Sequence, residues 1–180
     1  MKQYRYAKKF YNFRVVFIGY FVIFIFFFAL YSLLTDSNPV WAIVMLICLY
    51  QFFNTFISIS NPEEVDIDDQ YIAFKGFGKE HKYYFSEIHD FRVKEMVTSE
   101  KIYLRINKDD PSFFKGRYWI DCHYFNDSKQ LFHYFVEKED QLHPDTIKAY
   151  AHRSNRFTPE KKEEIEEYQK NRKEKSIIKK

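Results

Sequence analysis

Cysteine is scarce in this chain, with two residues in 180, which excludes a fold held together by several disulfides. Cys48 lies in a long uncharged run and Cys122 in a charged region, so the two are not expected to pair. A reducing compartment is the simpler interpretation. The six histidines lack the spacing of a metal-binding helix, and no Cys-x-x-Cys pair is present. We therefore expect no metal and no cofactor.

Charge is missing from two long runs near the N-terminus. Residues 15–35 and 37–62 contain no charged side chain, and Asp36 alone separates them. As a helix, each run is long enough to cross a bilayer core of about 30 Å. Because turn-forming residues join the runs, we expect an antiparallel transmembrane hairpin with spans at about 15–35 and 40–58. No small-x-small cleavage site follows the first run, which favours a retained span over a signal peptide.

Basic residues are distributed unevenly around this hairpin. The N-terminal flank holds five and no acidic residue, whereas the connection between the spans holds no Lys or Arg. The positive-inside rule then places both termini in the cytoplasm of a multi-pass protein of the cell (inner or plasma) membrane. Residues 63–149 carry 13 basic and 18 acidic side chains, a net charge of −5. Nucleic acid is therefore not expected as a partner, because phosphate binding needs a concentrated basic face.

The region after residue 63 alternates apolar and polar residues in short runs, which is typical of antiparallel strands. A helix with a cap at 126–128 and a stop at Pro144 follows. Its apolar stripe is wide enough to cover the open end of a small barrel. The expected strands lie at 65–67, 71–74, 81–85, 88–97, 102–106 and 117–123, and the stripe is Leu131, Phe132, Phe135, Val136 and Leu142.

Three segments carry a family resemblance: the run 65–74, the Tyr-Phe-Ser-Glu-Ile step at 84–88, and the strand at 120–125 that leads into the helix start. In this order, and after a two-span hairpin, they resemble the bacterial pleckstrin-homology (PH)-like membrane proteins. The resemblance implies a membrane α-hairpin (1–62) and an α+β cytoplasmic domain (63–145). That domain would be a small antiparallel PH-like β-barrel capped by one helix. A charged tail (146–180), helical or disordered, would follow.

The sequence of this domain gives few signs of a catalytic or ligand-binding site. The first hairpin turn is Asp68-Asp69-Gln70, which would repel a phosphate, so phosphoinositide binding is not expected. His89-Asp90 and the Asp121/His123 pair are not accompanied by a nucleophile motif or a phosphate loop. We therefore expect a protein that is not an enzyme.

Two groups of residues are candidates for contacts. Gln51, Asn54, Thr55 and Ser58 share one helical face of the second span, and such side chains seek partners on a neighbouring helix, in the same chain or in a second copy. The second group lies in an aromatic segment beside a basic cluster. It would be either core packing or a partner-binding surface, and it consists of Phe113, Phe114, Arg117 and Trp119.

Together these features predict a non-enzymatic inner-membrane protein. Its partners would be the lipid bilayer and either another protein or a second copy, and the inner leaflet is a further candidate contact of the PH-like domain. The alternative is a small membrane immunity or stress protein that acts through its transmembrane hairpin. In the first case the soluble domain carries the activity, and in the second the spans carry it.

Overall fold

The computed structural model describes residues 1–36, 38–108 and 115–154. The chain divides into two compact units, Met1–Val136 and a second that begins at Glu137. The candidate residues Phe113 and Phe114 lie outside the described residues, as does the tail from 155 onward.

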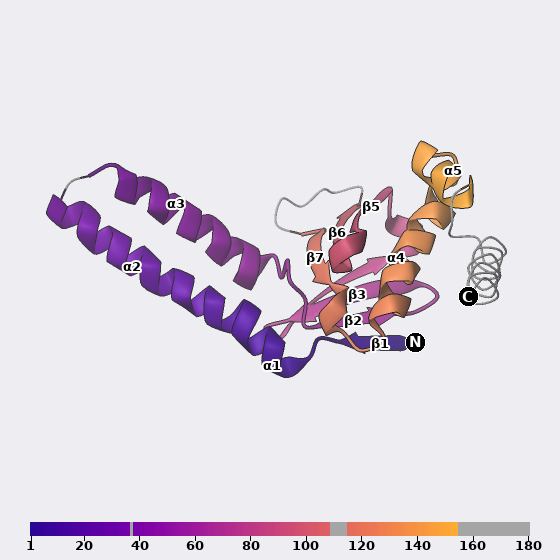
Figure 1. Ribbon diagram of the computed structural model, residues 1–180, viewed down its shortest axis with the longest axis horizontal. Coiled ribbons are helices and arrows are strands. Elements are labelled where there is room, and N and C mark those ends of the chain that lie inside the picture. The colour runs from indigo at the N-terminus through magenta and orange to yellow at the C-terminus, as the bar shows by residue number, and fades with distance from the viewer. Residues whose placement is uncertain (37, 109–114, 155–180) are drawn as a thin grey trace, which may run out of the picture. The chain divides into compact units, whose positions relative to one another are not determined.

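Two antiparallel helices form the hairpin (Figure 1). Both are long and apolar enough to cross a membrane, and they leave most of their surface exposed, unlike the core helix of a soluble protein. The first begins at Lys8, earlier than the expected span, because the helix continues through the basic residues before the uncharged run. The segments in order are α1 (Lys8–Tyr11), a π-helical stretch (Asn12–Phe17) and α2 (Ile18–Asp36), then α3 (Val40–Phe52) and a second π-helical stretch (Phe53–Ile57).

The first sheet joins the two ends of this hairpin. Its order is β1-β2-β3-β4 and all pairs are antiparallel. β1 precedes the first helix and β2 follows the second, so the basic N-terminal flank is a strand of the sheet. No strand was expected in this flank from the sequence. The bounds are β1 (Lys2–Arg5), β2 (Glu64–Ile67), β3 (Tyr71–Gly76) and β4 (Lys79–Tyr84).

The second sheet has the order β5-β6-β7, again antiparallel. The expected alternation of apolar and polar residues is confirmed in β7, where Tyr118 and Ile120 are buried and Trp119 is exposed. Cys122 and His123, expected at the end of this strand, instead form a 3-10 turn, Cys122–Tyr124. The strands are β5 (Asp90–Met96), β6 (Lys101–Asn107) and β7 (Arg117–Asp121). The seven described strands form two sheets and no closed barrel.

The core lies where the inner faces of the two sheets meet. The Tyr118 ring of β7 stacks on Phe74 of β3 with centroids 3.9 Å apart. Its hydroxyl lies 3.0 Å from His81 Nδ1 and 2.8 Å from the Tyr83 hydroxyl. Burial, with smaller effects from Lys115 and Lys79, lowers the pKa of His81 to about 4, so the imidazole is neutral at pH 7.

Helix α4 (Ser128–Leu142) carries the expected apolar stripe, of which Leu131, Phe132, Phe135 and Val136 are buried in the first unit. The fifth residue of the stripe, Leu142, belongs to the second unit and is half-buried. The Tyr4 hydroxyl of β1 donates a hydrogen bond to Gln130 Oε1 at the start of this helix, 3.1 Å away. In the second unit, α5 (Ile147–Ser154) adds a helix within the segment that was expected to be a charged tail. There Lys148 pairs with Glu139, and His152 lies 2.8 Å from Asp140.

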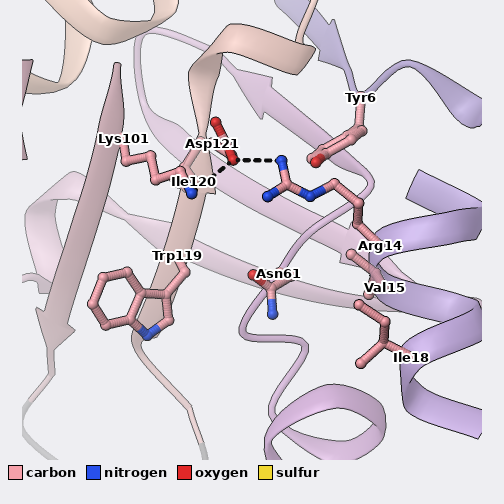
Figure 2. A pocket seen from close by; sticks show the side chains of 9 residues that line it. All are labelled: Tyr6, Arg14, Val15, Ile18, Asn61, Lys101, Trp119, Ile120 and Asp121. Atoms are coloured by element: carbon pink, nitrogen blue, oxygen red, sulfur yellow. Dashed lines mark hydrogen bonds and ion pairs between the residues drawn. The ribbon is translucent and has the colours of Figure 1, made fainter. Parts of the chain in front are cut away.

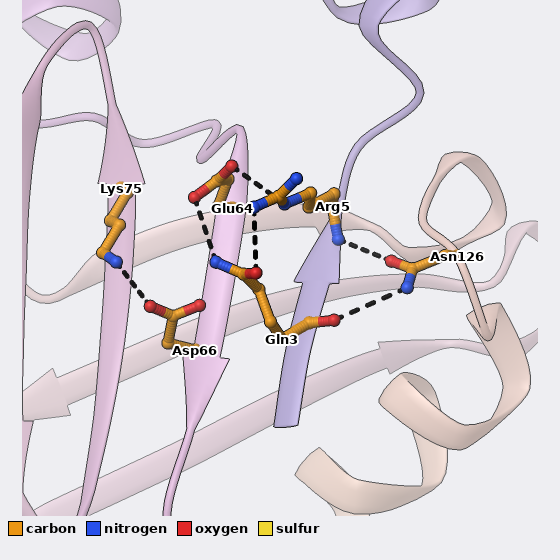
Figure 3. A network of polar contacts seen from close by, with 6 residues as sticks. All are labelled: Gln3, Arg5, Glu64, Asp66, Lys75 and Asn126. Atoms are coloured by element: carbon orange, nitrogen blue, oxygen red, sulfur yellow. Dashed lines mark hydrogen bonds and ion pairs between the residues drawn. The ribbon is translucent and has the colours of Figure 1, made fainter. Parts of the chain in front are cut away.

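The outer face of the first sheet carries a polar network (Figure 3). Arg5 of β1 pairs with Glu64 of β2, and the Asn126 side chain accepts a hydrogen bond from the Arg5 backbone N–H. Next to it, Asp66 is buried although it belongs to this outer face, and its Oδ2 pairs with Lys75 Nζ. The other carboxylate oxygen has no partner among the described residues.

Replacing Lys75 with methionine is expected to destabilise the protein by roughly 1–3 kcal/mol, because Asp66 would keep its burial and lose its cation. Thermal unfolding in detergent measures the change. Lys82→Met is the matched control, since Lys82 lies over the Tyr71 ring at 3.6 Å and should cost about 1 kcal/mol or less. Equal losses in the two variants would contradict a role for the Asp66 ion pair.

Candidate functional site

The β3–β4 turn joins the sheet to the hairpin. Phe77 and Gly78 both have positive φ, 51° and 71°, as in the two-residue turns that match the twist of paired strands. The turn places the Phe77 ring 4.9 Å from that of Phe56, at the end of the second helix, and 6.1 Å from that of Tyr11, in the first. Lys79 Nζ donates to the Phe56 carbonyl at 3.1 Å, where a helix C-terminus favours a cation.

Close packing continues behind this turn. Tyr11, Ile59 and the end of β3 at Gly76 meet there, and Tyr11 and Ile59 are fully buried. A Cβ on Gly76 would lie 2.6 Å from Ile59 Cγ2 and 3.2 Å from the Tyr11 hydroxyl oxygen, so only glycine fits. Ile59 has a φ of 49°, which is unfavourable for a β-branched residue and is maintained here by the surrounding packing.

We call the contact between the sheet and the hairpin, made by Tyr11, Ile59, Gly76 and Phe77, the junction. A pocket of about 330 Å³ opens beside it (Figure 2). Four parts of the chain contribute: the segment from β1 into the first helix, the residues after the second helix, the start of β6 and the end of β7. The lining residues are Tyr6, Arg14, Val15, Ile18, Asn61, Lys101, Trp119, Ile120 and Asp121. Polar side chains from these parts of the chain converge on the pocket, and it is our candidate site.

Two cations share one carboxylate oxygen in this pocket. Arg14 Nη1 and Lys101 Nζ each lie 3.2 Å from Asp121 Oδ2. The Arg14 guanidinium also lies over the Tyr124 ring, 4.8 Å from its centroid. Burial is the main cause that raises the pKa of Tyr6 to about 12, and Asp121 adds to it, so the phenol stays protonated. The three charged side chains carry a net charge of +1.

Trp119 forms one wall of the pocket. Its backbone N–H donates to the Ser60 carbonyl at 2.6 Å, which fastens β7 to the segment that leaves the second helix. The indole ring packs against Tyr103 with centroids 4.7 Å apart, yet 42% of the residue is exposed. Of the predicted partner surface, Trp119 lines the pocket, while Arg117 is exposed on the same strand and is not among the lining residues.

The four polar residues of the second helix do not form one shared contact. Gln51 is exposed, and Asn54 accepts a hydrogen bond from the Ser60 hydroxyl, within the same segment. The methyl group of Thr55 lies against Gly19 of the first helix, where a Cβ would be 3.2 Å away. Ser58 is buried near the junction. Their predicted role in helix contacts stays a prediction, with Gln51 the residue open to a second copy.

Sequence reasoning did not identify Arg14, Lys101 or Asp121 as one site, because they lie on three elements far apart in the chain. One local signal was present, since Arg14 is the last charged residue before the uncharged run. No protein-family model, curated protein or solved structure matches this chain. The site is therefore interpreted from its own chemistry.

Proposed function

We propose that this is a non-enzymatic protein of the cell membrane, whose hairpin anchors a cytoplasmic PH-like domain that binds another protein. One observation carries the proposal: the hairpin helices expose large apolar side chains. The rings of Phe13, Phe17, Phe21 and Phe24 stack in a row along the first helix, and each residue is at least 50% exposed. A helix surface of this kind is stable in lipid and unfavourable in water.

The arrangement of the strands supports an anchor with its domain on one side. β1 and β2 are neighbours in one sheet, so both ends of the hairpin lie at that sheet. The connection between the helices carries no Lys or Arg, which favours the cytoplasm for the sheets. After β1 and the hairpin, the other three strands of the first sheet, the three-stranded sheet and helix α4 follow one another, an order that supports a PH-type domain.

The partner-binding role is assigned to the exposed face of β7. Trp119 is the large hydrophobic residue that this strand leaves exposed, and Arg117 lies two residues before it on the same face. Tryptophan and arginine are the residue types enriched at the centres of protein interfaces. The pairing of β1 with β2 at the ends of the hairpin would then hold a bound partner close to the membrane.

Replacing Trp119 with serine is expected to remove at least about nine-tenths of the copurified partner, because interface tryptophans contribute about 2 kcal/mol or more. The measurement is in-cell crosslinking and affinity purification of the full-length chain, which retains β1. Tyr84→Ser is the matched control, since Tyr84 is 39% exposed on β4 in the other sheet.

Two outcomes would contradict the assignment. If only copies of the chain itself are recovered, the domain binds no other protein. If a stoichiometric partner is retained equally by Trp119→Ser and the unaltered chain, binding lies elsewhere. Recovery of the chain alone would favour the alternative function, a membrane immunity or stress protein that acts through its hairpin.

A further inference from the structure

The two cations of the junction pocket have more hydrogen-bond donors than Asp121 uses, and an anion can accept from the rest. Arg14 and Lys101 both point at Asp121, so two cations are balanced by one carboxylate (Figure 2). A guanidinium carries five N–H donors and an ammonium three, and a single shared oxygen does not use them all. The side-chain amide of Asn61 lines the same pocket. Phosphate oxygens are acceptors that match such a fork and point charge.

The position of the pocket identifies the source of that phosphate. Arg14 is followed by the uncharged run, and Val15 and Ile18, the next lining residues, are apolar. With the hairpin in a membrane, a charge at the end of a span lies at headgroup depth, with hydrocarbon beyond it. The exposed indole of Trp119 suits the same depth. A volume of about 330 Å³ matches a headgroup rather than a whole lipid.

We infer that the pocket binds the phosphodiester of a phospholipid headgroup, with Arg14 and Lys101 on the phosphate oxygens and Trp119 beside the glycerol. The inference rests on the proposed membrane anchoring. It names a lipid ligand for the face that also holds the predicted partner surface. The site is formed by the helix entry, β6 and β7, not by the acidic turn at 68–70 that argues against phosphoinositides.

The test uses the full-length protein in neutral detergent. A Trp41→Phe background leaves Trp119 as the single tryptophan, so its fluorescence reports the pocket. Dioctanoyl phosphatidylglycerol is expected to change the signal saturably, and inorganic phosphate should need at least about tenfold higher concentration because it lacks the apolar contacts. Dioctanoylglycerol, which has no phosphate, should leave the signal unchanged. An equal response to inorganic phosphate, or to dioctanoylglycerol, would overturn the lipid-phosphate assignment.

Single substitutions distinguish binding in the pocket from nonspecific electrostatic attraction of the lipid to the protein. Arg14→Gln and Lys101→Gln should each weaken phosphatidylglycerol binding by about tenfold or more, the loss expected for one charge-assisted hydrogen bond. Lys9→Gln removes the same charge from the same helix but outside the pocket, and should change binding by less than about twofold. An effect of Lys9→Gln as large as that of Arg14→Gln would contradict a defined pocket.

The Asp121→Asn variant distinguishes an effect on binding from a loss of folding. It frees both cations from their shared carboxylate, so binding should tighten by about threefold or more. Unfolding cannot produce such a gain, and weaker binding would overturn the inference. Alkaline extraction of native membranes tests the anchor independently: release of the protein would reject membrane insertion. The detergent titration would still report whether the pocket binds phosphate.

Discussion

Replacing Gly76 with valine is expected to lower the free energy of unfolding by about 3 kcal/mol. The first added carbon would lie 2.6 Å from Ile59 Cγ2, and the two valine methyl groups would extend into the same filled space. Ile59 cannot yield easily, because it is fully buried and already has an unfavourable backbone conformation. The lost stability should come from weaker packing between the sheet and both helices.

Denaturant unfolding in detergent, followed by Trp119 fluorescence in the Trp41→Phe background, measures this loss. Gly78→Ala is the matched control in the same turn. Gly78 has a φ of 71°, and a Cβ added there would meet no atom within 4 Å, so alanine at this position causes backbone strain alone. That strain should cost about 1 kcal/mol. Equal losses at the two glycines would show that the packing behind the turn is looser than described.

Lowering the pH from 6.5 to about 4 is expected to remove up to about 3 kcal/mol of stability through His81. Burial depresses the pKa of this imidazole in the folded protein, so in this pH range the unfolded chain binds the extra proton. The stabilising effect of a neutral His81 is complete above pH 6.5 and is lost as the pH falls. Below about pH 4 this group causes no further change.

Thermal unfolding at a series of pH values, compared between variants, isolates this effect from that of the carboxylates. His81→Gln keeps a polar partner for the Tyr118 hydroxyl and cannot take up a proton, so its stability should depend less on pH between 6.5 and about 4. His123→Gln is the control, because that side chain is exposed. Identical pH dependence in His81→Gln and the unaltered chain would contradict a buried neutral imidazole.

Local patterns predicted most of the elements but not how they assemble. The uncharged runs indicated the hairpin, and alternation indicated β2 to β7 within a few residues, because both patterns are written in consecutive residues. β1 has no such pattern, since Tyr4 is its only buried residue and its partner strand lies beyond the whole hairpin. Barrel closure is a matter of long-range pairing, and alternation carries no information on it.

The candidate site shows the same division. Alternation along β7 correctly placed Trp119 outward, because neighbours in a strand face opposite sides. The pairing of Arg14 and Lys101 with Asp121 depends on two links to the hairpin ends: the bridge between Tyr6 and Phe125, and the hydrogen bond from the Trp119 backbone N–H of β7 to the Ser60 carbonyl. No local pattern contains that information.

The pairing of β1 with β2 also sets an order of events during synthesis. About 60 residues separate the two strands, and the ribosome needs roughly 3–12 s to add them at about 5–20 residues per second. During that interval β1 has no neighbouring strand, and both helices must leave the ribosome before it gains one. Completion of the first sheet therefore requires that the hairpin has been synthesised. If the hairpin fails to fold, β1 stays exposed as an unpaired strand edge. Quality-control proteases and chaperones engage surfaces of this kind.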